Sequence, residues 1–187
     1  MSIQIYKPNK NNNGFAFNFS MGFERKNKEP VLYVSAIAQH SWDDKRRVGS
    51  FSANKDDPTK NLNLKFNEFE CGSIIDALER RYEYSTFHKF EENKTTIKFS
   101  PWDKTAKSSK FNPASKKYED YEFISPCFGL SITKNGNNTF KIPLEPGESF
   151  CIKQYIKKIL NSIYSQRDTI RLKEYSNSSN KPQDCPI

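Results

Sequence analysis

The chain has 187 residues, a length that suits one domain of ordinary size. Its aromatic content of 14% is too high for a disordered chain, so we expect a folded, aromatic-rich core. The 30 basic and 22 acidic side chains give a net charge of +8, which favours polyanionic partners such as nucleic acid. No apolar run is long enough to span a membrane, and the first residues lack the pattern of a signal peptide. These features predict a soluble intracellular protein, in the cytoplasm or on a nucleoid, with no membrane partner.

The cysteines are spread along the chain and form no C-x-x-C pair. They are Cys71, Cys127, Cys151 and Cys185. This spacing argues against a zinc site and against a small disulfide scaffold. We therefore expect buried free thiols.

Alternation of apolar and polar residues with period two predicts β-strands in the first half of the chain. Residues 15–21 place three phenylalanines and a methionine on one face, and residues 62–66 alternate in the same way. Residues 31–38 are apolar on both faces, which is typical of a central strand covered on both sides. The period then changes, and residues 68–81 predict a short amphipathic helix capped by Asn67.

The second half repeats this order. Residues 84–88 and 95–99 predict two further strands. Residues 103–122 are rich in Lys, Ser and Asn and carry little apolar material, which predicts a long mobile loop. Residues 128–132 and 140–144 alternate on either side of an Asn-Gly turn and form the clearest hairpin.

Apolar residues at helical spacing predict a longer amphipathic helix, with Ser149 as its candidate cap, that runs to about residue 165. The polar residues 166–187 predict a disordered C-terminal tail, which leaves residues 1–165 as a single domain. Each half is therefore a set of strands closed by one helix. We predict an α+β fold of two antiparallel β-sheets with about four strands each, one short helix and one longer helix.

The sequence contains few groups that could carry out catalysis. None of the 7 glycines belongs to a phosphate-binding loop, and neither histidine is paired with a second ligand at metal spacing. Asp76 and Glu92 are the best candidates for the carboxylates of a metal-dependent nuclease. However, Asp76 lies in a predicted helix and Glu92 in a turn, whereas such ligands are best held on adjacent strands. We expect a protein that is not an enzyme and needs no cofactor or metal.

Basic residues that alternate with aromatic residues near strand ends are the stronger signal. Cations can neutralise phosphates, and exposed rings can stack on unpaired bases. The predicted phosphate ligands are Arg25, Lys26, Lys45, Arg46, Arg47, Lys65, Lys98 and Lys104. The predicted stacking platforms are Tyr33, Trp42, Phe51 and Trp102.

The order of elements resembles the Whirly-type proteins that bind single-stranded DNA. The resemblance lies in residues 62–75, which run from a strand into a helix, and in the following Ser-Thr-Phe-His strand at residues 85–88. Residues 128–132 lead to 140–144 and then into a helix at 150–164, and the whole resemblance covers about residues 3–165. It implies paired four-stranded sheets, helices that mediate self-association, and nucleic acid running over sheet faces and edges with little base preference.

We therefore predict a homo-oligomeric protein that binds single-stranded DNA, in preference to RNA, in replication or transcription. The first alternative is an auxiliary protein-interaction subunit of a polymerase or another replication or transcription complex, in which the basic hairpins bind an acidic protein. The second alternative is the metal-dependent nuclease described above.

Overall fold

A computed structural model describes residues 2–179, except for the side chains of Phe90 and residues 177–179. The first half contains β1 (Ser2–Lys7), β2 (Phe15–Phe23), β3 (Pro30–Ala38), β4 (Ser41–Asp43), β5 (Val48–Ser50), the 3-10 turn η1 (Ser52–Asn54), β6 (Asn61–Phe66) and α1 (Glu68–Arg80). The second half contains β7 (Tyr84–Phe90), β8 (Asn93–Asn112), β9 (Lys117–Lys134), β10 (Asn138–Leu144) and α2 (Pro146–Ser179). Each half is thus a set of strands followed by a helix.

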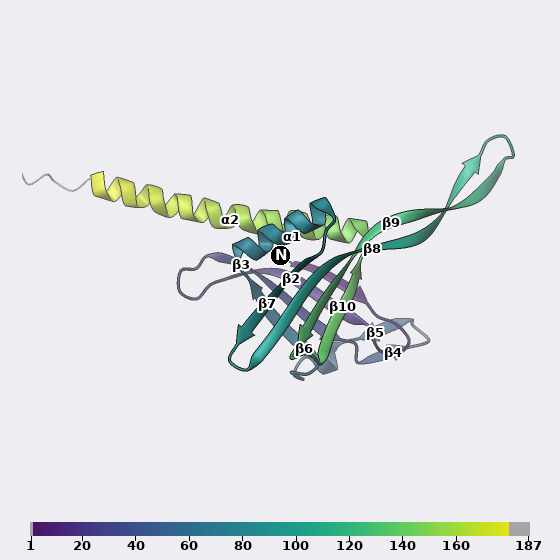
Figure 1. Cartoon of the computed structure of the whole chain (residues 1–187), viewed down its shortest axis with the longest axis horizontal. Helices are drawn as coiled ribbons and strands as arrows, with labels where there is room; N and C mark the ends of the chain where they lie inside the picture. The colour runs from purple at the N-terminus through teal and green to yellow at the C-terminus, as the bar shows by residue number, and fades with distance from the viewer. Residues whose placement is uncertain (1, 180–187) are drawn as a thin grey trace, which may run out of the picture.

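The main strands form two four-stranded antiparallel sheets, with the orders β1-β2-β3-β6 and β10-β9-β8-β7. In Figure 1 the helices lie together along one side of the sheets, while α2 and the β8–β9 hairpin project beyond the body at opposite ends. The predicted α+β class and the two four-stranded sheets are confirmed.

Alternation along the strands sends one face of each sheet into a shared core. Phe17 and Phe19 come from the first sheet and Phe99 and Leu130 from the second, and each is at most 1% exposed. The core cluster continues through α2, whose isoleucines pack against both sheets. Burial of this much apolar surface is the main stabilising contribution to the fold.

Helix α1 begins and ends close to the predicted residues. The Asn67 side chain accepts a 2.9 Å hydrogen bond from the backbone N–H of Glu70, whose carboxylate accepts one of 2.9 Å from the N–H of Asn67. This reciprocal capping box satisfies two N–H groups at the start of the helix. At the other end Arg81 adopts the left-handed conformation (φ 57°), and its N–H bonds to the carbonyl of Ala77.

The predicted mobile loop at residues 103–122 is wrong, because most of this segment is β-structure. Strands β8 and β9 stay paired without interruption from Thr95↔Lys134 to Asn112↔Lys117. Cross-strand contacts such as the 3.2 Å ion pair between Lys107 and Glu122 replace the hydrophobic alternation of an ordinary strand. We call residues 103–126, which form the projecting part of this hairpin, the arm.

Helix α2 differs from the prediction at both ends. It begins at Pro146, so Ser149, the predicted cap, lies inside the first turn, and the helix continues to Ser179. Proline is favoured in the first turn of a helix because its missing N–H would have no partner there. The predicted disorder is therefore wrong for residues 166–179, and residues 180–187 lie outside the described residues. Arg167 supports the longer helix through ion pairs of 2.8 Å with Glu29 and with Glu68.

Strands β1, β4 and β5 were not distinguished in the sequence. The side-chain amide of Gln39 connects these strands, and it is buried, with only 5% of the residue exposed. Its Oε1 accepts a hydrogen bond of 2.8 Å from the N–H of Asn9, and its Nε2 donates to the carbonyls of Asn9 (2.8 Å) and Ser41 (3.0 Å). Gln39 thereby fixes the β1–β2 loop beside the short β4–β5 hairpin.

The cysteine prediction holds for two of the described residues. Cys71 and Cys127 are buried free thiols, whereas Cys151 is exposed, so the prediction is wrong there. Cys185 lies outside the described residues. In the part of the chain that the structure describes, no helix is both long and apolar enough to cross a membrane.

Candidate nucleic-acid interface

The outer face of the second sheet carries lysines among small polar side chains. In β8, Lys98 lies between Ile97 and Phe99, which are 0% and 1% exposed, so period two directs Lys98 away from the core. Ser131 of β9 pairs with Lys98 on one side and with Lys141 of β10 on the other. The serine side chain is short, so it does not cover either lysine on the outer face of the sheet.

This row of residues forms one wall of a groove of about 1080 Å³, which we call the second-sheet groove. The β1–β2 loop and the two strand residues that flank it, Lys7 of β1 and Phe15 of β2, also line this groove. Trp102, 46% exposed, lines the groove at the base of the arm. Three lysines and an open indole ring therefore face one elongated hollow.

The outer face of the first sheet forms a second hollow of about 620 Å³, which we call the first-sheet groove. Tyr6, Tyr33 and Phe51 line it, and the rings of Tyr6 and Phe51 meet edge to face at 5.8 Å between centroids. Tyr33 lies over Gly22, where an added Cβ would come within 2.5 Å of the ring. The glycine thus provides the space that this ring occupies.

Several lysines predicted to bind phosphate already contact carboxylates. Lys98 lies 2.8 Å from Glu83, and its hydrogen bond lowers the pKa of that carboxyl. Lys65 contacts Glu24, which raises the pKa of Lys65. Lys141 is exposed and makes no ion pair within residues 2–179. Phosphate binding at Lys98 or Lys65 would therefore exchange one anionic partner for another, whereas Lys141 is available directly.

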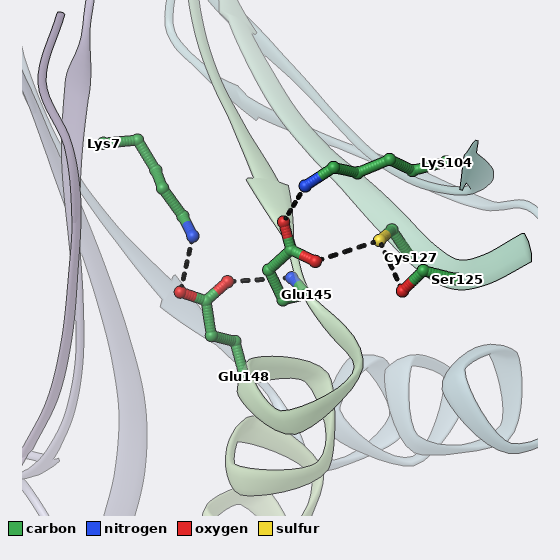
Figure 2. A network of polar contacts seen from close by, with 6 residues as sticks. All are labelled: Lys7, Lys104, Ser125, Cys127, Glu145 and Glu148. Atoms are coloured by element: carbon green, nitrogen blue, oxygen red, sulfur yellow. Dashed lines mark hydrogen bonds and ion pairs between the residues drawn. The ribbon is translucent and has the colours of Figure 1, made fainter. Parts of the chain in front are cut away.

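A network of polar contacts joins the groove to the arm and to α2 (Figure 2). Lys7 contacts Glu148 at 2.7 Å, and the other oxygen of Glu148 accepts a 2.8 Å hydrogen bond from the N–H of Glu145. The Glu145 carboxylate contacts Lys104 at 2.8 Å and accepts a 3.4 Å hydrogen bond from the Cys127 thiol. The contact with Lys104 lowers the pKa of Glu145, and burial raises the pKa of Cys127. The network fixes the start of α2 against β1 and the base of the arm.

The predicted site residues do not form one patch. Arg25 and Lys26 lie in the β2–β3 turn, close to α2, because Arg167 binds Glu29 at the end of that turn. The β4–β5 hairpin carries the second basic group at the opposite end of the first sheet. This second group consists of Trp42, Lys45, Arg46 and Arg47.

Trp42 is only partly available as a stacking platform. It is half-buried, and its Nε1 donates a hydrogen bond of 3.0 Å to Asp44. By contrast, Lys98 and Trp102 meet in the second-sheet groove, and Tyr33 and Phe51 meet in the first-sheet groove. Each basic turn groups only residues that are neighbours in sequence, whereas the first-sheet groove brings Tyr33 and Phe51 together from different elements.

Sequence reasoning missed Lys7, Lys141 and Tyr6. Lys141 had a readable signal, because it lies between the inward-facing Phe140 and Ile142 of the predicted hairpin. Lys7 and Tyr6 had no such signal, because β1 was not predicted and its pairing with β2 depends on contacts distant in sequence.

The two residues suggested for a nuclease lie in different elements, and Asp76 has other partners. Asp76 forms a 2.7 Å ion pair with Arg80 and accepts a 2.9 Å hydrogen bond from Tyr82. Glu92 lies in the turn between β7 and β8. Within residues 2–179, no group of three or more His, Cys, Asp or Glu side chains is arranged to hold a metal ion.

The chain consists of four antiparallel strands followed by a helix, repeated once, and two solved structures match it over nearly its whole length, so the Whirly-type resemblance seen in the sequence is confirmed at the level of the fold. The chain is similar to WHY1 from Arabidopsis thaliana, with 12% identity, a TM-score of 0.54, and 99% of this chain and 97% of that chain covered. It is also similar to the plant transcriptional regulator PBF-2, with 14% identity, a TM-score of 0.53, and coverage of 99% and 90%. Sequence comparison with known families and with curated proteins gives no match.

Proposed function

We propose that the protein binds single-stranded nucleic acid, DNA in preference to RNA, across the outer faces of its two sheets. The observation that carries this proposal is the second-sheet groove, where Lys7, Lys98 and Lys141 face the same hollow as Trp102. Lysines that track a backbone and an open ring that stacks on bases are the combination used by proteins that bind single strands.

The groove suits binding with little sequence preference. Its lysines are point charges that contact phosphates, which are identical at every nucleotide. An indole ring stacks on any base because every base has a π-face. Small residues such as Ser100, Gly129 and Ser131 separate the charged groups and let a strand approach the sheet closely. Neither effect requires a metal or a cofactor, and we propose a binding protein rather than an enzyme.

The remaining predicted residues have supporting roles in this proposal. The rings of Tyr33 and Phe51 provide stacking positions in the first-sheet groove. The exposed cations of the β2–β3 turn and of the β4–β5 hairpin attract the strand from solution, because long-range attraction raises the rate of encounter.

We also propose that the protein is a homo-oligomer that acts in replication or transcription. Phe69 of α1 and Tyr164 of α2 line one shallow hollow, and they are 80% and 47% exposed. Large exposed apolar groups on neighbouring helices favour a contact between subunits. Sedimentation velocity should show a species larger than the 21.8 kDa monomer. The Phe69→Ser variant should contain a smaller fraction of this larger species. A monomer at all concentrations would contradict this part of the proposal.

The main test is fluorescence anisotropy with labelled single-stranded DNA, single-stranded RNA and duplex DNA of equal length, each measured over a range of salt. We expect single-stranded DNA to bind most tightly, with a logarithm of affinity that falls linearly with the logarithm of salt concentration. Equal and weak binding to all three would show that the charge of +8 is a generic basic surface. In that case an acidic protein partner, such as a polymerase subunit, would be the better explanation of the basic hairpins.

A further inference from the structure

The arm continues the outer face of the second sheet. The β8–β9 register has no break between Thr95↔Lys134 and Asn112↔Lys117, so no bulge changes which residues share a face. Residues of β8 that line the second-sheet groove, such as Lys98 and Trp102, have even numbers. Even-numbered residues of β8 and odd-numbered residues of β9 therefore share this face along the whole arm. We call this face of the arm the outer arm face. Figure 1 shows the arm leaving the body and twisting as it goes.

The outer arm face is basic. Its charged residues are Lys104, Lys110 and Lys117, against the single carboxylate Glu119. Lys104 is paired with Glu145 at 2.8 Å, whereas Lys110 and Lys117 make no ion pair within residues 2–179, and Glu119 accepts a hydrogen bond of 2.6 Å from the neutral amide of Asn112. Positive charge thus continues outward from the groove, beyond the body of the protein.

The opposite face of the arm is acidic. Its charged residues are Asp103, Asp120 and Glu122, against the single Lys107. Lys107 is paired with Glu122 at 3.2 Å, and Asp103 with Arg81 at 2.6 Å. A two-stranded ribbon with one basic and one acidic face has a built-in preference for which face an anion contacts.

The outer arm face also carries open aromatic rings. Tyr121 and Phe123 are 49% and 43% exposed, and their centroids lie 6.1 Å apart. Their partners across the ribbon are Ser108 and Ala106, whose small side chains leave the rings uncovered. At about 3.3 Å per residue, Phe123 lies roughly 13 Å and Tyr121 roughly 20 Å along the strand from Trp102. Three rings therefore follow one another along the face that carries the lysines.

We propose that the outer arm face binds the part of a single strand that extends beyond the second-sheet groove, so that the arm lengthens the binding site. This inference rests on the proposed function and extends it. Two observations select nucleic acid as the occupant: the face is continuous with the groove, and its lysines and open rings are complementary to phosphates and bases. The arm would then distinguish long strands from short ones, because only a long strand reaches Phe123 and Tyr121.

The test compares matched double variants in the full-length chain. Tyr121→Ser/Phe123→Ser removes a ring pair from the outer arm face, and Phe111→Ser/Tyr118→Ser removes the ring pair of the opposite face, whose centroids are 5.4 Å apart. Both are measured by anisotropy with oligothymidylates of roughly 8 and 30 nucleotides, the shorter lying within the range that one module covers. The outer variant should bind the long strand roughly tenfold or more weakly and the short strand as the wild type does. The opposite variant should leave both affinities unchanged.

A second pair of variants does not depend on how the rings pack. Lys110→Gln removes a cation from the outer arm face, and Lys107→Gln removes one from the opposite face. Lys110→Gln should lower the steepness of the salt dependence for the long strand by about 0.7, the value for one phosphate contact on a single strand. Lys107→Gln should leave the steepness unchanged.

Three outcomes would overturn the inference. The first is wild-type affinity for the long strand in Tyr121→Ser/Phe123→Ser together with an unchanged slope in Lys110→Gln. The second is an equal loss from both faces. The third is a loss accompanied by a change in sedimentation, which would make the arm a contact between subunits. Failure of the proposed function itself would give a different result: the wild-type protein would bind neither oligonucleotide in a salt-dependent way.

Discussion

Lys98→Gln/Lys141→Gln tests the second-sheet groove most directly. For single strands, each neutralised phosphate contributes about 0.7 to the slope of log affinity against log salt. If Lys7, Lys98 and Lys141 each contact one phosphate, the groove contributes a slope of about −2.1, and the double variant retains about −0.7. Between 50 and 200 mM salt, these contacts alone should then lower the affinity about 18-fold in the wild type and about 3-fold in the variant.

The assay is anisotropy with labelled single-stranded DNA at several salt concentrations. The matched control is Lys153→Gln/Lys157→Gln, which removes the same charge from α2, where both lysines contact Glu79 at 3.7 and 2.6 Å. We expect the control to keep the wild-type slope. An equal reduction in both double variants would mean that net charge, not the groove, sets the affinity, and an unchanged slope in Lys98→Gln/Lys141→Gln would remove these lysines from the interface.

Three further predictions concern single residues. Trp102→Ala should weaken single-strand binding by about 1–3 kcal/mol through lost stacking, and unchanged affinity in the same anisotropy assay would exclude the ring from the site. Asn67→Ala should lower the free energy of unfolding by about 1 kcal/mol in urea titration, because the N–H of Glu70 loses its cap; a fully retained stability would contradict the role of the capping box. Burial raises the pKa of Cys71 to about 12, so its thiolate is scarce at pH 8. Residue-resolved mass spectrometry after alkylation should show the exposed Cys151 modified before Cys71, and equally fast modification of Cys71 would refute its burial.

The fold could be predicted because its main signals are local. The alternation in residues 15–21, the cap at Asn67 and the Asn-Gly hairpin each depend on neighbours in sequence, and each predicted element is present. The arm could not be predicted in the same way. Both of its faces are exposed to solvent, so it lacks the apolar alternation by which a half-buried strand is recognised. Its strands are joined by cross-strand pairs that only the register reveals.

The end of α2 was missed for a related reason. Residues 166–179 are polar, and the contacts that support their first turn are ion pairs from Arg167 to Glu29 and Glu68, distant in sequence.

The candidate site was predicted in part. Lys98 and Trp102 were chosen from composition near a strand end, but only sheet pairing shows that they share a groove with Lys141. The roles of all these residues in binding remain predictions.

One face of each sheet packs in the core and the other faces solvent, and this difference affects how binding can be tested. Lys98 lies between residues that are 0% and 1% exposed, and Lys141 between residues that are 2% and 1% exposed. The inward neighbours stabilise the fold, and changing them would leave cavities that cost about 2–5 kcal/mol. The two lysines point away from this core, so replacing them changes the charge of the groove and leaves the inward side chains unchanged. Loss of binding in these variants would therefore report on the interface, and a matching loss of stability would show that the outer faces also support the fold.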